Sequence, residues 1–296
     1  MTGSARAGEP TLAIDIGGTK ILVALVSNGR LLGSRQLLTD RNAGGDAWCD
    51  AIAEAALPWR GHYKVAGAAV TGAIDKGRWY ALDPETLPIS PGYPLCERLG
   101  DRLGVPVVCQ NDAQAAAWGE FRFGSGRGAD MVFVTISTGV GAGVVLGGRL
   151  TNEGAGSPGS LGFAQALEDG EITPTKAFGS GRWMALRAGD RAADARDVFA
   201  AAHAGADWAH EIISLSLDRM ARLLRGVQRV LDPDVLVIGG GIGLAPGYFE
   251  GLTQRLECGQ RTSFRRAHLG LYAGVAGTAD LALATLTDKE TVDEQR

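Results

Sequence analysis

Leu12-Ala-Ile-Asp-Ile-Gly-Gly-Thr-Lys-Ile-Leu-Val-Ala-Leu-Val26 is the stretch of this chain that says most about its fold. Two apolar runs rich in β-branched residues flank a turn on Gly17 and Gly18, where glycines let a ligand approach the main chain closely. The turn adds a hydroxyl and a cation, and Asp15 places a carboxylate before it. Exposed amides, a hydroxyl and a cation suit phosphate oxygens, and a carboxylate suits a hydrated Mg²⁺ ion. Taken alone, the same residues also fit an ordinary Gly-Gly hairpin.

The pattern of an apolar strand that ends in a glycine turn occurs twice more. Residues 131–136 lead into Ser-Thr-Gly-Val-Gly-Ala-Gly at 137–143, and residues 235–238 lead into Gly-Gly-Gly-Ile-Gly at 239–243. No Gly-x4-Gly-Lys-Ser/Thr pattern occurs, and a Rossmann spacing fits poorly because an apolar run, not a helix, follows the second turn. A nucleotide held between two lobes needs such turns from both sides. The three turns together therefore indicate a nucleotide-binding cleft.

Composition limits the class of protein. The chain has 296 residues, a net charge of −4 and 45% hydrophobic residues. No apolar run reaches the roughly 18 residues of a membrane span, so we expect a soluble protein without a membrane partner. Its basic residues are scattered, which argues against a nucleic-acid partner. The first ten residues lack the apolar core of a signal peptide, so we expect a cytoplasmic location.

The cysteines lie far apart and form no Cys-x-x-Cys pair; they are Cys49, Cys96, Cys109 and Cys258. We expect all four to be reduced, in keeping with a cytoplasmic location. No histidine lies near them in a metal-binding pattern, so we expect no zinc site.

The order of apolar and helical patterns predicts an α/β fold. An opening meander of three strands is expected at 12–16, 21–26 and 31–38. Further strands are expected at 65–70, 105–108, 131–136 and 235–238, and helices at about 46–57, 113–121 and 207–230. Strands that alternate with helices predict two lobes with mixed sheets and a cleft between them. We place the lobes at 11–118 and 119–287, with flexible tails at 1–10 and 288–296.

Asp112 follows Asn111 where a strand is expected to end and a helix to begin. An aspartate at such a point often serves only to cap the helix. However, this position lies at the expected hinge between the lobes, where sites form, and the glycine turns offer phosphate binding but no base. Phosphoryl transfer to an alcohol needs a carboxylate that takes the hydroxyl proton. We therefore predict Asp112 as the base and Asp15 on the Mg²⁺ side.

Taken together, these residues resemble the ROK family of sugar kinases and repressors, within the actin-like ATPase superfamily. The matching motifs occur in the family's order and cover the chain from about residue 11 to 287: Asp15-Ile-Gly-Gly-Thr-Lys20, Thr71-Gly72, Asn111-Asp112-Ala113, Ser137-Thr-Gly-Val-Gly141 and Gly239-Gly-Gly-Ile-Gly243. Segments 111–118 and 130–141 look particularly like bacterial N-acetylmannosamine kinases. The resemblance implies a two-lobed actin-like ATPase fold, related to ribonuclease H. It also implies ATP- and Mg²⁺-dependent phosphorylation of the 6-hydroxyl of a hexose or amino-hexose.

The resemblance also implies roles for individual residues. Asp112 is expected to be the general base, Asn111 and Gly72 to contact sugar hydroxyls, and Asp15 to hold Mg²⁺ through water. The residues expected to face the ATP phosphates are Gly17, Gly18, Thr19, Lys20, Thr138 and Gly139, and those expected along the adenosine are Gly239, Gly240 and Gly241. A homodimer is implied in the same way. Family repressors carry a DNA-binding segment of several dozen residues before the first turn, whereas 14 residues precede Asp15 here, so we expect a kinase.

The chain departs from the family pattern in the loop after the second glycine turn. The family's Glu-x-Gly-His element falls on 160–163, where Ser160 and Phe163 replace the acid and the histidine, and the family's zinc-binding cysteine loop is absent. A family glutamate falls on Lys176, which we count as a substrate-binding candidate. Either a zinc-free lineage rebuilt this loop around a common hexose, or recognition of the C1/C2 side of the sugar has changed.

The exchange of a carboxylate for Lys176 bears on the identity of the sugar. It replaces hydrogen-bond acceptors with donors, which disfavours glucose. N-acetylmannosamine, N-acetylglucosamine and a rarer amino sugar such as kanosamine remain open. A second hypothesis is a catalytically weak protein that senses a sugar or a nucleotide, supported only by the changes in this loop. Retention of Asp112 favours the enzyme, because a sensor needs no base there.

Overall fold

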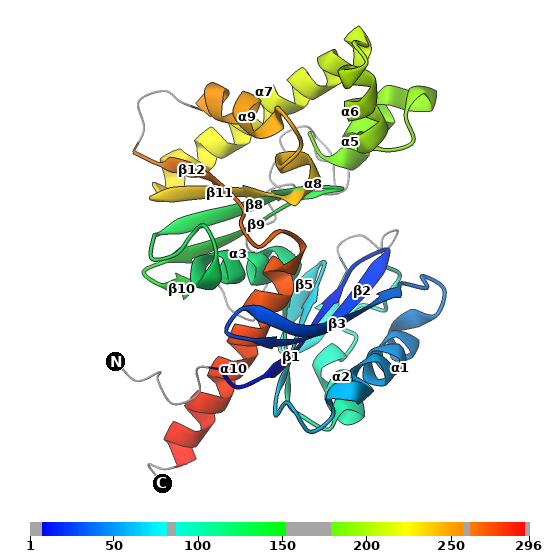
Figure 1. The fold of residues 1–296 in the computed structure, drawn as a ribbon, viewed down its shortest axis with the longest axis vertical. Coiled ribbons are helices and arrows are strands. Elements are labelled where there is room, and N and C mark those ends of the chain that lie inside the picture. Colours follow the sequence, from blue (N-terminus) through cyan, green and yellow to red (C-terminus); the bar gives the residue numbers. More distant parts are fainter. Residues whose placement is uncertain (1–7, 82–86, 152–178, 257–260, 294–296) are drawn as a thin grey trace.

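The computed structural model describes residues 8–81, 87–151, 179–256 and 261–293. The chain forms two halves, each built on a five-stranded sheet (Figure 1). The first sheet has the order β3-β2-β1-β4-β7, with the bounds β1 Thr11–Ile16, β2 Lys20–Ser27, β3 Arg30–Leu38, β4 Ala66–Val70 and β7 Val107–Asn111. Strands β1, β2 and β3 are antiparallel, and β1, β4 and β7 are parallel.

The second sheet repeats this topology. Its order is β10-β9-β8-β11-β12, with the bounds β8 Met131–Ile136, β9 Val140–Leu146, β10 Arg149–Leu150, β11 Val235–Gly239 and β12 Ser263–Arg266. Again the first three strands in sequence are antiparallel and the later two run parallel to the first. A separate hairpin, β5 Ala73–Asp75 with β6 Arg78–Tyr80, follows β4. Both sheets are therefore mixed, as predicted.

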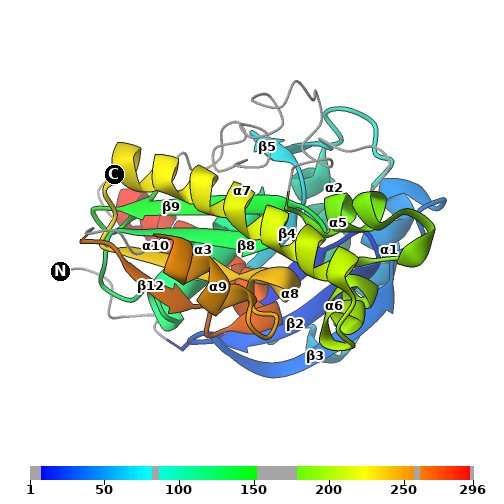
Figure 2. The same cartoon turned by 90° about the horizontal axis from the view of Figure 1, so that it is seen from above.

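Helices cover the outer face of each sheet. Helices α1 (Gly44–Ala56) and α2 (Leu95–Leu103) pack on the first sheet, where the alternate residues Leu12, Ile14 and Ile16 of β1 face them. The helices on the second sheet are α5 Gly181–Ala188, α6 Ala195–His203, α7 Asp207–Leu231 and α9 Tyr248–Leu256. Figure 2 shows the long α7 lying across this sheet beside α9. The short segments are η1 Leu57–Trp59, η3 Gly189–Arg191, η4 Gly270–Tyr272 and α8 Gly240–Gly243.

Two helices form the layer between the sheets (Figure 1). Helix α3 (Asp112–Phe123) follows β7 of the first sheet but packs on the second, where Ala117 joins a buried cluster with Phe133 and Val145. Helix α10 (Ala273–Asp293) follows β12 of the second sheet and packs on the first, where Val275 lies with Ala13. Each sheet is thus covered on its inner face by a helix that follows a strand of the other sheet. The lobe boundaries at 118 and 287 remain a prediction, although the last helix lies against the first sheet.

Helices α3 and α10 approach so closely that two of their contact residues must be glycine. A Cβ atom placed on Gly277 would collide with the backbone carbonyl of Ala115, and one on Gly119 would collide with that of Ala273. Farther along the contact, the Asp280 carboxylate accepts hydrogen bonds from Trp118 Nε1 (2.8 Å) and Arg122 Nε (2.9 Å). The crossing therefore joins the halves by both packing and charge.

Most predicted elements are present with shifted ends. The opening meander is confirmed, and the helix expected at 113–121 runs from Asp112 to Phe123. The strand expected at 105–108 lies later, at Val107–Asn111. The third glycine element, predicted as a turn, instead begins the short helix α8 at Gly240, whose φ of +83° is a conformation that glycine adopts readily.

The prediction of four reduced cysteines is wrong for one pair. Cys96 on α2 and Cys109 on β7 form a disulfide, with Cα atoms 6.1 Å apart. Helix α2 packs back against the strand that follows it, and this antiparallel return brings together two residues 13 positions apart, a spacing that carries no motif. Cys49 is a free, buried cysteine, and Cys258 lies outside the described residues.

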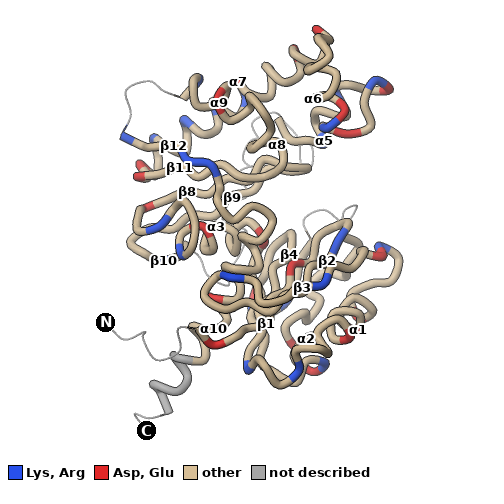
Figure 3. The backbone as a smooth tube through the Cα atoms, in the orientation of Figure 1, with Lys and Arg blue, Asp and Glu red and all other residues tan. Residues whose placement is uncertain are grey.

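The charged side chains are spread over both halves (Figure 3). Within the described ranges, no helix combines the length and apolar character that crossing a bilayer requires.

Gly277→Ala is expected to lower the free energy of unfolding by about 3 kcal/mol or more, because the new methyl group meets backbone that cannot move aside. Gly226→Ala in α7 is the matched control. No atom lies within 4 Å of a Cβ at this helical position, so the change should raise stability by up to about 1 kcal/mol. Urea denaturation followed by circular dichroism compares the two. Equal effects would contradict the close crossing.

Candidate active site

The candidate site lies where parallel strands of the first sheet end. Strands β1 and β4 pair Asp15 with Ala69, and β4 and β7 pair Val70 with Asn111. Because the carboxyl ends of parallel strands share one edge of a sheet, Asp15, Asn111 and the Thr71–Gly72 segment meet there. The structure thus brings together three parts of the chain predicted to serve one site.

Asn111 joins two of these parts. Its Oδ1 accepts hydrogen bonds from the N–H groups of Ala113 (3.0 Å) and Gln114 (3.2 Å), which caps α3. Its Nδ2 donates to the carbonyl oxygen of Gly72 at 2.8 Å. Gly72 has φ +112°, and a Cβ on it would meet the backbone of Tyr80. The Asn111 side chain also hydrogen-bonds the Asp112 carboxylate, so it ties the end of β7 to both the Gly72 turn and the start of α3.

Asp112 is the first residue of α3 rather than its cap. Its Oδ1 accepts the N–H of Ala113 at 2.8 Å, and the side chain is partly buried. Burial raises the pKa of the Asp112 carboxyl to about 6, although hydrogen bonds from Ala113 and the Asn111 side chain act in the opposite direction. A carboxylate with a pKa near 6 is largely ionised at neutral pH and takes up a proton more readily than an ordinary aspartate.

Asp15 is the second partly buried carboxylate of the site. Burial, and after it the negative charge of Asp112, raise the pKa of Asp15 to about 7. Helix α10 begins beside it, since a Cβ on Gly274 would lie 3.4 Å from Asp15 Oδ2. A buried carboxylate with a second carboxylate near it marks a place where a cation is favoured.

The turn at 17–20 is closed by a hydrogen bond from the Gly17 N–H to the Lys20 carbonyl (3.0 Å). The Gly17 carbonyl accepts from Thr39 Oγ1 at 2.7 Å, and the Thr19 carbonyl accepts from the Thr39 N–H at 3.0 Å. Among the described residues, no acceptor takes the N–H groups of Gly18 and Thr19. Open amides in a glycine turn next to Lys20 form a nest for an anion.

The second glycine turn lies against α3 and α5. A Cβ on Gly141 would lie 3.0 Å from Cβ of Ala113, so this hairpin touches the first turn of the helix that carries Asp112. At the tip of the hairpin, the Ser137 N–H donates to the Gly139 carbonyl (2.8 Å), and the Arg182 N–H donates to the Thr138 carbonyl (3.1 Å). The tip is therefore fixed by the N-terminus of α5.

The third glycine element adjoins the second. Gly239 ends β11, and Gly240 and Gly241 begin α8. A Cβ on Gly240 would collide with the backbone of Ile136, which stands just before the second turn. The two elements predicted to bind different parts of a nucleotide are thus neighbours in the second half.

Part of the predicted sugar site cannot be placed. Ser160, Phe163 and Lys176 lie outside the described residues. In the described ranges, no group of three or more His, Cys, Asp or Glu could hold a metal ion. This finding does not extend to the other residues, and the absence of a zinc site stays a prediction.

Two supporting residues escaped the sequence analysis. Thr39 holds the first glycine turn from 22 positions away, and Trp79 Nε1 donates to the carbonyl of Thr71 at 2.8 Å. A threonine after a strand and a tryptophan in a hairpin carry no local signal of such contacts. Only the pairing of β2 with β3 and of β5 with β6 brings them into place.

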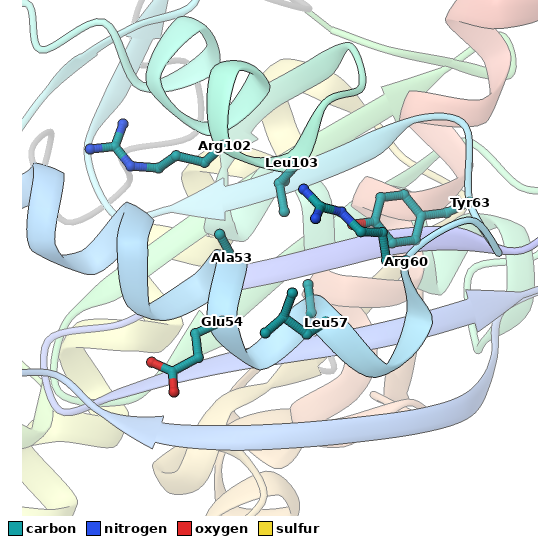
Figure 4. Close-up of a pocket in the computed structure, with 8 residues that line it drawn as sticks. Ala53, Glu54, Leu57, Arg60, Tyr63, Arg102 and Leu103 are labelled. Atoms are coloured by element: carbon teal, nitrogen blue, oxygen red, sulfur yellow. The ribbon is translucent and has the colours of Figure 1, made fainter.

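A groove elsewhere has no part in this site (Figure 4). Its volume is about 200 Å³, and it is lined by Ala53, Glu54, Ala56, Leu57, Arg60, Tyr63, Arg102 and Leu103. These residues come from the C-terminal ends of α1 and α2 and from the segment 57–63 that leads from α1 to β4. The groove therefore lies at the opposite edge of the first sheet from Asp15 and Asp112.

The fold and the glycine turns agree with one family. The ROK family model matches residues 11–285. The chain belongs to the ROK family. Its fold is that of the actin-like ATPases, as the solved structures of ROK members below indicate.

Two named relatives carry the sequence comparison. A bifunctional enzyme NanE/NanK of Brucella melitensis is 46% identical over 291 residues, which are 95% of this chain and 55% of that protein. An N-acetylmannosamine kinase of Escherichia coli is 37% identical over 285 residues, which are 92% of this chain and 98% of that protein. The chain thus spans about half the length of the bifunctional relative.

Two solved structures carry the structural comparison. A ROK hexokinase from Thermus thermophilus superposes with a TM-score of 0.81 at 30% identity, covering 94% of this chain and 99% of that one. A ROK family glucokinase from Streptomyces griseus, in complex with glucose and AMPPNP, superposes with a TM-score of 0.78 at 28% identity, covering 93% of this chain and 99% of that one.

Folding stability is expected to fall as the pH rises from about 5 to about 8. Raised pKa values mean that the folded chain binds more protons than the unfolded chain between 3.8 and the folded-state values of about 6 and about 7. The loss accumulates through this window and levels off above it. Asp15→Asn should remove the larger part of this pH-dependent loss of stability. It should also raise the free energy of unfolding at about pH 8 by about 1–3 kcal/mol.

Urea denaturation across this pH range measures the effect. Asp194→Asn is the control, because Arg196 lowers the pKa of exposed Asp194 and its titration lies below the window. In that variant, the free energy of unfolding should fall with pH as steeply as in the wild type. A wild-type stability that rises between about pH 5 and about pH 8 would contradict the raised pKa values.

Proposed function

We propose that this chain is an ATP-dependent sugar kinase that phosphorylates the 6-hydroxyl of a hexose or amino-hexose, with N-acetylmannosamine as the first candidate. The observation that carries the proposal is the setting of Asp112. This carboxylate has a pKa raised to about 6 and starts α3 between the sugar-side turn at Gly72 and the glycine turn of the second half. The Escherichia coli relative supports the choice of sugar, because it matches nearly the whole chain and is named N-acetylmannosamine kinase.

Asp112 would accept the proton of the 6-hydroxyl. The hydroxyl oxygen then forms a bond to the γ-phosphorus of ATP, the bond from that phosphorus to the ADP oxygen breaks, and the proton stays on the carboxylate. Asn111 would contact a sugar hydroxyl, while its side chain also bonds the Gly72 carbonyl and the Asp112 carboxylate. Gly72 would lie against the sugar on the same side.

The ATP phosphates would lie between the two glycine turns. The open N–H groups of Gly18 and Thr19, with Gly17 and Lys20, fit the phosphates from the first half. Thr138 and Gly139 would face them from the second half, and the segment 239–241 would lie along the adenosine. Bound AMPPNP in the Streptomyces griseus glucokinase supports the use of ATP.

The residues present fit Mg²⁺. Asp15 is a partly buried carboxylate whose charge is disfavoured by burial and by Asp112, so a cation there compensates an existing electrostatic cost. We propose that Asp15 holds the ion through water. When bound, Mg²⁺ would neutralise charge on the phosphate oxygens during transfer.

Asp112→Asn is expected to lower kcat by at least about a thousandfold, because the amide cannot accept the proton. Binding of AMPPNP, measured by calorimetry, should be unchanged, since Asp112 binds no nucleotide. In the wild type, kcat/KM should fall below about pH 6 as Asp112 becomes protonated. Unchanged turnover in the variant would favour the second hypothesis, a catalytically weak sensor of sugar or nucleotide.

A coupled assay of ADP release with Mg²⁺ tests the sugar. N-acetylmannosamine is expected to give the highest kcat/KM in a panel with N-acetylglucosamine, glucose, mannose, glucosamine and kanosamine, and a zinc-selective chelator should have no effect. Turnover of glucose alone, or loss of activity with the chelator, would overturn the choice of sugar or the zinc-free site. We further propose that the protein is a cytoplasmic homodimer that binds no nucleic acid. Light scattering on the purified protein tests its oligomeric state.

A further inference from the structure

Two buried tryptophans pack against each other behind the candidate site. Trp48 on α1 is 3% exposed and Trp79 on β6 is fully buried. Their ring centroids lie 6.1 Å apart, with the planes tilted by 50°. Both belong to the core of the first half. Each ring has one polar atom, its indole N–H, and each N–H is bonded to a backbone carbonyl.

Trp79 holds the sugar-side turn. Its indole N–H donates to the Thr71 carbonyl at 2.8 Å, and the next carbonyl, that of Gly72, accepts from Asn111 Nδ2 at 2.8 Å. Two successive carbonyls of one turn are therefore fixed by two side-chain donors. Because Gly72 shares Asn111 with the cap of α3, a shift of this turn also moves the Asn111 amide.

Trp48 holds the strand end that braces the phosphate turn. Its indole N–H donates to the Asp40 carbonyl at 2.7 Å. The adjacent residue, Thr39, bonds the carbonyl groups of Gly17 and Thr19 through its hydroxyl and its N–H. The position of the turn with the open amides thus depends on a segment fixed by Trp48.

We propose that Trp48 and Trp79 are positioning residues, one for each substrate turn. Trp79 sets the sugar-side turn at 71–72, and Trp48 sets the phosphate turn at 17–20. The inference rests on the proposed function, because it assigns sugar to one turn and ATP to the other. It adds to that function the side chain that holds each turn in place within the first half.

The indole N–H groups, rather than the rings, carry this role. A phenylalanine at either position keeps an aromatic ring in the core and removes the donor, so the carbonyl of Asp40 or Thr71 loses its indole partner. The lost hydrogen bond frees a turn that binds substrate through its own backbone. An effect confined to one substrate is therefore expected, whereas loss of packing would weaken the whole half.

The test measures KM for both substrates in Trp79→Phe and Trp48→Phe, with the sugar found in the assay above. Trp79→Phe should raise the sugar KM about threefold to tenfold and leave the ATP KM within about twofold. Trp48→Phe should do the reverse. The double variant should show both KM changes, each of about the size found in the single variant.

Trp118→Phe is the matched control. Its indole N–H also makes a 2.8 Å bond, to Asp280 between α3 and α10, but holds neither turn. It should lower stability like the other two variants and leave both KM values unchanged. Equal changes of both KM values in the Trp48 and Trp79 variants, or none, would overturn the proposal.

Nuclear magnetic resonance on the ¹⁵N-labelled wild type decides the question if a variant does not fold. Sugar alone should shift the Trp79 indole N–H signal more than that of Trp48, and AMPPNP alone should do the opposite. Equal shifts from either ligand would overturn the proposal. If the wild type phosphorylates no sugar and binds none, the proposed function itself has failed. Turnover without the split between the two KM values refutes only the roles of the tryptophans.

Discussion

The close crossing of helices α3 and α10 is the constraint on which the rest of the structure depends. Gly119 and Gly277 let the backbones touch, and the two helices form the layer shared by both sheets. The same helices begin at the site: α3 starts with Asp112, and α10 starts beside Asp15. The contact that joins the halves therefore also fixes the distance between the carboxylates and the glycine turns of the second half.

Burial of two carboxylates at one sheet edge costs stability, and the cost is useful. Burial raises the pKa values of both Asp112 and Asp15, and the negative charge of Asp112 adds to the rise at Asp15. A base for a sugar hydroxyl benefits from a raised pKa, and a cation site benefits from charge that is not already neutralised. The fold supplies both conditions because β1 and β7 flank β4 and end at the same edge of the sheet.

The sequence predicted what local signals encode. The meander, the first two glycine turns and the junction at Asn111 and Asp112 follow from patterns a few residues long, and the structure has all of them. The contacts of Thr39 and Trp79, the pairing of Cys96 with Cys109 and the return of α10 to the first sheet depend on tertiary packing, which no local pattern reports. The short helix at Gly240 was missed because a glycine run signals a turn and a helix start alike.

The repeated topology of the two sheets has a consequence for how such a site diversifies. Strands β1 and β8 hold the same place in their sheets, and Thr135 in β8 stands where Asp15 stands in β1. Of two like sheets, the first thus carries the acids and the second a neutral hydroxyl at the matching point. Under the proposed function, mutations in the second sheet would change the binding of the phosphate donor and leave the proton-accepting carboxylate of the first sheet unchanged.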